Sequence, residues 1–122
     1  MVEGPTILVV EDEQEIRRFL RASLENQSYR IVEAQTARDG LKRAAEDHPD
    51  LVLLDVVLPK KNGFQVCRQL KTTVETSGAK VILVSSKNQP SDRFWGMKQG
   101  ADEYLTKPFE AQDLLATVQR SL

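Results

Sequence analysis

The chain has 122 residues, of which 40% are hydrophobic and 29% are charged, and its net charge is −1, which suits one compact globular domain. The small net charge gives no electrostatic reason to expect nucleic acid or an anionic membrane as a partner, and no apolar stretch approaches the roughly 20 residues of a membrane span. Residues 1–5 lack the basic-then-apolar layout of a signal peptide, and the single cysteine, Cys67, excludes an internal disulfide. We therefore expect one cytoplasmic domain over residues 1–122.

The first half of the chain alternates between strand-like and helix-like segments. Residues 6–10 form an apolar run typical of a buried strand, and apolar side chains at helical spacing then predict a helix over about residues 14–26. Residues 30–34 predict a shorter, more amphipathic strand. Thr36 can cap a second helix, which ends before Pro49.

The second half continues the same alternation. Its strands are predicted at residues 51–55, 80–84 and 103–106, and its helices at about 64–70, 90–99 and 110–122. Pro90 suits the first turn of the fourth helix, and Gly100 suits the position just after its end. Five strands that alternate with five helices predict an α/β fold, with a doubly wound, five-stranded parallel sheet covered by helices on both faces.

The helix over residues 90–99 carries three large apolar side chains. We expect Phe94 and Met97 on the side of the core. Trp95 has only polar neighbours three and four residues away, so we expect it to face away from Phe94 and the core. It is then either the anchor of a partner surface or a side chain that folds over the fifth strand, and the sequence leaves both open.

Polar residues follow the predicted strands, at the edge of the sheet where open α/β proteins bind ligands. They are Glu11, Asp12, Asp55, Ser85, Ser86 and Lys107. Asp55 is the most informative of them, because an ionised carboxylate at the end of a buried strand is costly unless something pairs with it.

Three acids at one edge repel one another, so at least one pKa among Glu11, Asp12 and Asp55 should rise unless a cation is bound. Mg²⁺ prefers such oxygen ligands, Lys107 can add an ammonium, and Ser85 can add a hydroxyl. This set suits phosphoryl transfer to a carboxylate, with Asp55 as the nucleophile and with Mg²⁺ and Lys107 neutralising charge. No glycine-rich phosphate loop is present, so a nucleotide is not the obvious donor.

Four motifs lie in order at the ends of the first, third, fourth and fifth predicted strands. They are Val9-Val10-Glu11-Asp12, Leu53-Leu54-Asp55-Val56-Val57-Leu58-Pro59-Lys60-Lys61-Asn62-Gly63, Val84-Ser85-Ser86 and Gly100-Ala101-Asp102-Glu103-Tyr104-Leu105-Thr106-Lys107-Pro108-Phe109. Over nearly the whole chain the sequence resembles the receiver domain of two-component response regulators, the CheY-like family. The resemblance implies a flavodoxin-like fold with strand order 2-1-3-4-5.

A narrower resemblance rests on Asn62-Gly63-Phe64-Gln65 and on the stretch from Asp92 to Ala101. These segments are similar to regulators of twitching motility and pilus chemotaxis of the PilH kind.

The family resemblance also implies roles for the acidic residues. Asp55 matches the phosphoacceptor, Glu11 and Asp12 match the acidic pair that binds Mg²⁺, and Val57 would add its backbone carbonyl as a metal ligand. Glu11 stands where aspartate is commoner, and it can still bind the cation, through water if its side chain does not reach directly. Val57 has no side-chain group to orient water, which leaves the hydrolysis rate of the acyl phosphate open.

Further roles are implied for the residues near the ends of the fourth and fifth strands. Ser85 matches the switch hydroxyl that turns toward the phosphoryl oxygens, and Lys107 matches the lysine beside the phosphate. Tyr104 matches the switch aromatic whose ring moves inward, although it could also be a static residue at the core margin. The Lys107–Pro108 bond matches one that is cis in the family.

The resemblance implies a stand-alone response regulator receiver that catalyses only its own phosphorylation and dephosphorylation. A sensor histidine kinase or a histidine phosphotransfer protein would phosphorylate Asp55. Output would be a change in protein–protein contacts at the face formed by the fourth helix, the fifth strand and the fifth helix. The sequence names neither the kinase, nor the output partner, nor the pathway.

Two other functions remain open. A phosphatase of the haloacid dehalogenase type also uses an aspartyl phosphate, but it needs a second aspartate two residues on, where this chain has Val57. A receiver-like interaction module that is no longer phosphorylated would need none of the acids. Glu11 and Asp12 could also simply cap the first helix.

Overall fold

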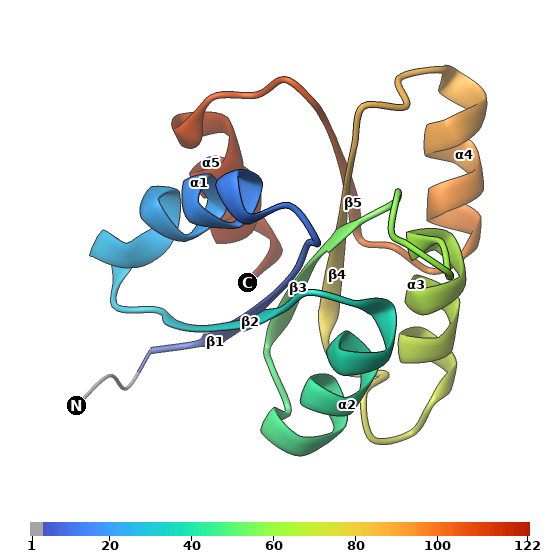
Figure 1. Ribbon diagram of the computed structural model, residues 1–122, viewed down its shortest axis with the longest axis horizontal. Coiled ribbons are helices and arrows are strands. Elements are labelled where there is room, and N and C mark those ends of the chain that lie inside the picture. Colours follow the sequence, from blue (N-terminus) through green and yellow to red (C-terminus); the bar gives the residue numbers. More distant parts are fainter. Residues whose placement is uncertain (1–3) are drawn as a thin grey trace.

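The computed structural model of the protein describes residues 4–122, so the first three residues of the domain expected over 1–122 lie outside the described part. Within that range the chain forms a five-stranded sheet in the order β2-β1-β3-β4-β5, and every pair of neighbouring strands is parallel. Helices cover both faces of the sheet (Figure 1). The observed order and layers confirm the doubly wound, flavodoxin-like α/β fold.

The element bounds follow the sequence prediction closely. The strands are β1 (Thr6–Val10), β2 (Arg30–Ala34), β3 (Leu51–Asp55), β4 (Lys80–Ser85) and β5 (Glu103–Thr106), and the helices are α1 (Gln14–Leu24), α2 (Ala37–Asp47), α3 (Gly63–Thr72), α4 (Pro90–Lys98) and α5 (Ala111–Ser121). The sequence predicts a first helix to about residue 26, but α1 ends at Leu24 and the chain continues as a 3₁₀ turn over Glu25–Gln27. Ser28 follows that turn with a φ of 61°, a left-handed conformation that ends the helical path.

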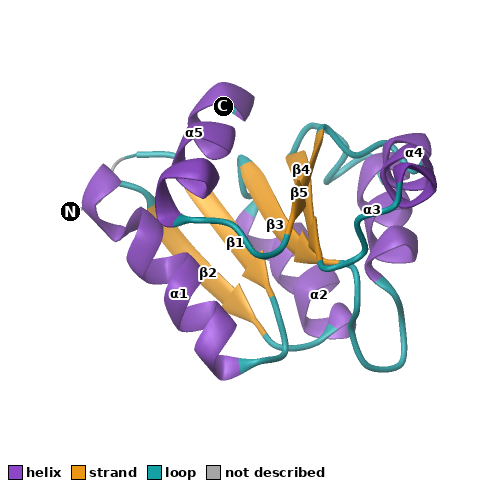
Figure 2. Ribbon diagram, turned by 90° about the horizontal axis from the view of Figure 1, so that it is seen from above, coloured by secondary structure: helices purple, strands orange, loops and turns teal. Residues whose placement is uncertain are grey.

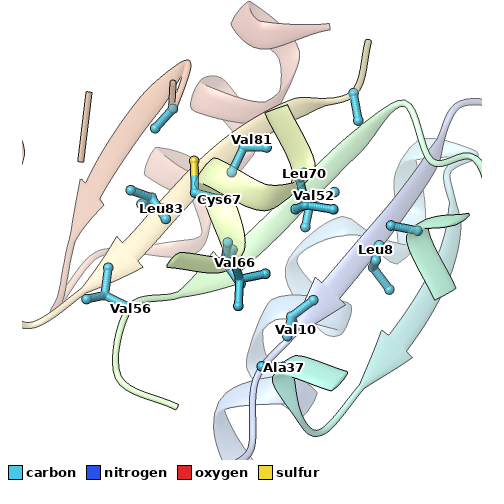
Figure 3. Packing of buried hydrophobic residues seen from close by; sticks show 14 of the residues in the cluster. Leu8, Val10, Ala37, Val52, Val56, Val66, Cys67, Leu70, Val81 and Leu83 are labelled. Atoms are coloured by element: carbon cyan, nitrogen blue, oxygen red, sulfur yellow. The ribbon is translucent and has the colours of Figure 1, made fainter. Parts of the chain in front are cut away.

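The strand side chains divide between two buried clusters, because successive residues of a strand point to opposite faces. Leu8 and Val10 belong to the cluster that α2 and α3 cover, whereas Ile7 and Val9 belong to the cluster beneath α1 and α5 (Figure 2). Figure 3 shows the first cluster, in which Cys67 of α3 is packed. Burial raises the pKa of the Cys67 thiol to about 12, so this cysteine is a packing residue.

The helices of residues 4–122 are all too short or too polar to cross a membrane.

Helix α4 differs from the sequence prediction. Phe94 and Met97 do not face the core: their side chains are 61% and 40% exposed, and Trp95 is 54% exposed. Among residues 90–98, Gly96 alone is buried. A Cβ at Gly96 would lie 2.8 Å from Cδ1 of Leu83 and 3.0 Å from Cδ2 of Tyr104. The helix therefore rests on the sheet through a glycine, and this close approach leaves no room beneath it for Phe94 or Met97.

The start of α3 is equally close to the end of β3. The amide of Gly63 donates to the carbonyl of Val56 at 2.7 Å, and a Cβ at Gly63 would lie 2.2 Å from the backbone oxygen of Asp55. This contact holds the loop after β3 against the strand end that carries Asp55.

We predict that Gly63→Ala lowers the free energy of unfolding by about 1–3 kcal/mol, because the new methyl group must push backbone atoms apart. Urea denaturation followed by circular dichroism measures the change. Gly78→Ala is the matched control, since a Cβ there would meet nothing within 4 Å. Equal stability of the Gly63 and Gly78 variants would contradict the close contact.

Candidate functional site

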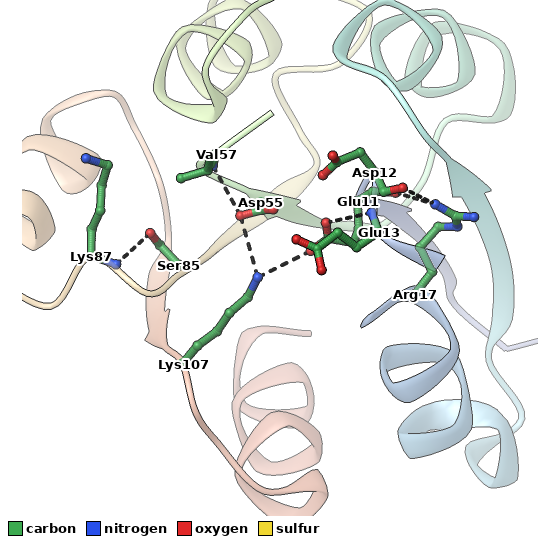
Figure 4. A network of polar contacts seen from close by, with 9 residues as sticks. All are labelled: Glu11, Asp12, Glu13, Arg17, Asp55, Val57, Ser85, Lys87 and Lys107. Atoms are coloured by element: carbon green, nitrogen blue, oxygen red, sulfur yellow. Dashed lines mark hydrogen bonds and ion pairs between the residues drawn. The ribbon is translucent and has the colours of Figure 1, made fainter. Parts of the chain in front are cut away.

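Three acids meet at the carboxyl edge of the sheet. Glu11 and Asp12 follow β1, and Asp55 is the last residue of β3. These strands are neighbours with Val10 paired to Leu54, so the residues that follow the pair also lie side by side. Each acid offers a carboxylate oxygen within 4.8 Å of the other two (Figure 4). The structure thus brings together the acids that the sequence singles out.

The three carboxylates differ in their access to water. Glu11 is 1% exposed and Asp55 is 7% exposed, whereas Asp12 is exposed. The cluster is therefore open on the side of Asp12 and closed beneath Glu11.

Lys107 supplies the positive charge that faces this cluster. Its Nζ atom lies 3.4 Å from Oε1 of Glu11 and 3.8 Å from Oδ1 of Asp55. The amide of Lys107 donates to the carbonyl of Ser85 at 2.8 Å, which ties the loop after β5 to the end of β4. The Lys107–Pro108 peptide bond is cis, as the family resemblance implies.

One ammonium does not balance three carboxylates. Burial raises the pKa of Glu11 to about 7, and the nearby charge of Asp55 adds to the rise, while Lys107 opposes it. Burial also raises the pKa of Asp55, again against Lys107. A raised pKa is what the sequence predicts for this cluster, but the largest cause is burial and not the repulsion between the acids.

Arg17 supports the backbone of the acidic pair, and it is not among the site residues expected from the sequence. Its Nη1 atom donates to the backbone carbonyls of Glu11 and Asp12, at 2.9 Å each. Its Nε atom lies 3.4 Å from Oε1 of Glu33 on β2, and Arg21 donates to the other oxygen of Glu33. The guanidinium therefore fixes the backbone from which both acids project.

A signal for this role is present in the sequence. Arg17 shares a helical stripe with Leu20 and Leu24, three and seven residues further on, and all three are buried. A charged side chain on the buried stripe of a helix needs partners, and here those partners are the carbonyls of the site.

Two backbone amides orient the carboxylates. The amide of Val57 donates to Oδ1 of Asp55, and the amide of Glu13 donates to Oε2 of Glu11, each at 3.2 Å. Glu13 is the N-cap of α1 and makes no side-chain capping bond. Glu11 therefore supports the start of the helix while its other oxygen, Oε1, faces Lys107. The Val57 carbonyl as a metal ligand stays a prediction.

Ser85 and Tyr104 are joined through the backbone of Lys87. The hydroxyl of Ser85 accepts a hydrogen bond from the Lys87 amide at 3.0 Å (Figure 4), and the hydroxyl of Tyr104 donates to the Lys87 carbonyl at 2.8 Å. The Tyr104 ring is buried, and burial raises the pKa of its phenol. Both residues thus bind one peptide segment between β4 and α4, and the tyrosine ring is turned inward.

The donor chemistry of the cluster fits Mg²⁺. Magnesium prefers oxygen ligands, keeps several waters and is usually held by one or two carboxylates. Glu11, Asp12 and Asp55 offer carboxylate oxygens, and the exposed Asp12 leaves the cluster within reach of water.

Comparison with known proteins agrees with this geometry. Residues 7–119 match the family model described as response regulator receiver domain. Over 116 residues the chain is 42% identical to protein PilH of Pseudomonas aeruginosa, covering 95% of this chain and 96% of PilH. It is also 42% identical over 116 residues to the KDP operon transcriptional regulatory protein KdpE of Escherichia coli, where it covers 95% of this chain but spans only 50% of KdpE.

A solved structure shows the same fold. The chemotaxis response regulator CheY4 of Vibrio cholerae matches with a TM-score of 0.92 at 26% sequence identity, covering 98% of this chain and 100% of that chain.

The raised pKa of Glu11 predicts a pH dependence of stability in the metal-free protein. The pKa is about 7 in the folded state against 4.5 as the ordinary value, so the folded state binds the proton more tightly. The resulting stabilisation is complete below pH 4.5 and is lost as the pH rises through about 7. Between pH 5 and 8 we expect the wild type to lose about 1–3 kcal/mol more than Glu11→Gln, which does not titrate.

Urea denaturation in EDTA across this pH range measures the difference. A loss in Glu11→Gln as large as that in the wild type would contradict the raised pKa.

For Arg17 we predict an effect on metal affinity. Arg17→Met removes both bonds to the carbonyls behind the acids and should weaken Mg²⁺ binding about tenfold, as loss of groups that orient metal ligands commonly does. Isothermal titration with Mg²⁺ measures the affinity. Arg21→Met is the control, because Arg21 contacts Glu33 but neither carbonyl, and its affinity should stay near that of the wild type. If both variants bind Mg²⁺ equally well, Arg17 does not position the acids.

Proposed function

The chain belongs to the response regulator receiver domain family, and from this premise we propose that it is a phosphorylated signalling switch with Asp55 as phosphoacceptor. The observation that carries the proposal is the position of Asp55. It lies at the carboxyl end of β3, beside two further acids and 3.8 Å from the ammonium of Lys107.

In this proposal a sensor histidine kinase or a histidine phosphotransfer protein presents phosphohistidine at the edge of the sheet. A carboxylate oxygen of Asp55 attacks the phosphorus, the P–N bond breaks, and an aspartyl phosphate forms. The Val57 amide holds the attacking carboxylate in place. Lys107, already next to Asp55, pairs with the phosphoryl oxygens.

Glu11, Asp12, Asp55 and the carbonyl of Val57 would hold Mg²⁺, which neutralises charge on the transferring group when bound. The buried acids also favour the switch over an interaction module that is not phosphorylated. Raising the pKa of Glu11 to about 7 means that its charged form is destabilised in the fold. An arrangement with such a cost is typical of functional sites, whereas a passive docking domain has no use for it.

The phosphoryl group adds roughly −1.5 to −2 charges. The Ser85 hydroxyl now accepts a hydrogen bond from the Lys87 amide. If this hydroxyl turns toward the phosphoryl group, that hydrogen bond breaks. Tyr104 holds the carbonyl of the same residue, so the two switch residues would act on one backbone segment. Phosphorylation then shifts the balance between conformers of this segment and of the face formed by α4, β5 and α5.

Output in this proposal is a protein–protein contact at that α4-β5-α5 face, in the cytoplasm, by a stand-alone receiver. The phosphatase alternative has less support, because Val57 occupies the position of its general acid and carries an exposed apolar side chain.

We predict that Asp55→Asn abolishes labelling by radioactive acetyl phosphate in the presence of Mg²⁺, since the amide cannot attack phosphorus as a carboxylate does. EDTA should suppress labelling of the wild type. Asp39→Asn is the control, because Asp39 is only partly buried and lies in α2, away from the acidic cluster, and it should be labelled normally. Undiminished labelling of Asp55→Asn would contradict the assignment, and steady release of phosphate from p-nitrophenyl phosphate would favour a phosphatase.

A further inference from the structure

A groove of about 560 Å³ lies between α3 and α4. We call it the α3–α4 groove. The residues that matter for its chemistry are Lys61, Gln65, Arg68, Gln69, Trp95 and Gln99. It lies apart from the acidic cluster and shares only α4 with the α4-β5-α5 face.

Trp95 is the aromatic anchor of this groove. Because Gly96 takes the contact with the sheet, Trp95 is displaced to the side of α3, and its large side chain stays half exposed. It does not fold over β5. Phe94 is next to it in sequence and more exposed, and the ammonium of Lys98 lies 5.5 Å from the centroid of the Phe94 ring. Exposed aromatic residues of this kind are typical of binding surfaces.

The charge of the groove is positive, although the chain as a whole carries −1. Residues 60–72 contain Lys60, Lys61, Arg68 and Lys71, and they contain no acid. Lys71 is neutralised by Asp102, 3.1 Å away. Among the ion pairs of residues 4–122, none includes Lys61 or Arg68.

The groove is also lined by glutamine amides. Gln65 and Gln69 on α3 are exposed and can donate and accept hydrogen bonds, which are the bonds that an extended peptide backbone needs. Gln99 is buried and its side chain already donates to the Trp95 carbonyl. Lys61 already donates to Oε1 of Gln69.

We propose that the α3–α4 groove docks an extended acidic segment of a partner protein. An aliphatic or aromatic residue of the segment packs on Trp95, and flanking carboxylates pair with Lys61 and Arg68. The amides bind the backbone of the segment. A nucleic acid fits less well, because two unpaired cations and a chain of net negative charge provide little attraction for a phosphate backbone. The docking does not depend on phosphorylation of Asp55.

The test is selection of a displayed random dodecapeptide library on the wild-type protein. Enriched peptides should combine acidic residues with an aliphatic or aromatic residue. Trp95 is the single tryptophan of the chain, so titration of a synthetic enriched peptide without tryptophan should shift its fluorescence to shorter wavelength. Added salt should weaken the binding.

Variants locate the binding site by fluorescence polarisation of the labelled peptide. Trp95→Ala should weaken binding roughly tenfold or more, and Arg68→Gln about two- to fivefold. The controls are Phe19→Ala, an exposed aromatic residue on α1, and Arg43→Gln, an exposed arginine on α2. Both should bind like the wild type.

Several results would overturn the proposal. These are a failure to enrich any peptide, enrichment of basic peptides, binding that survives Trp95→Ala, or displacement of the peptide by a 20-nucleotide oligothymidylate. Asp55→Asn should bind the peptide normally. If the wild type is not labelled by acetyl phosphate but binds the peptide, only the phosphorylation proposal is contradicted. If it is labelled but binds no peptide, only the docking proposal is contradicted.

Discussion

The parallel pairing of β1 with β3 is the contact on which the site depends. The chain leaves β1 toward β2 on one side and returns to β3 on the other, so the carboxyl ends of these central strands are adjacent. Residues that are more than forty positions apart in sequence, Glu11 and Asp55, are thereby held together. The buried clusters on both faces of the sheet stabilise this pairing, because β3 is buried along its whole length.

The same arrangement makes the site electrostatically strained. Glu11 is enclosed at the bottom of the cluster, and its charged form is disfavoured mainly because water is excluded. Lys107 offsets part of this cost through its ion pair with Glu11. Arg17 holds the backbone of Glu11 and Asp12 through hydrogen bonds to their carbonyls. The fold thus holds three carboxylates beside a single ammonium, an arrangement whose chemistry suits a divalent cation.

Helix α4 connects the site to two surfaces. Gly96 lets the helix approach Tyr104 and Leu83 closely, and Tyr104 is tied to the segment that Ser85 also binds. The large side chains of α4 are consequently displaced outward, toward the α3–α4 groove and toward solvent. One steric constraint therefore accounts for both the inward tyrosine and the exposed tryptophan.

Much of the molecule was determined by the sequence alone. Apolar runs and helical spacing define the strands and helices to within one or two residues, and their alternation implies the parallel sheet, at whose edge Glu11, Asp12, Asp55, Ser85 and Lys107 must lie. Patterns in the sequence predict such features because the features depend on residues that are near one another in the chain. Tertiary structure alone decided the seating of α4 on Gly96, the bonds of Arg17 to the site, and burial as the main cause of the pKa of Glu11. These depend on how closely separate elements approach one another, and periodicity within one element carries no information about that distance.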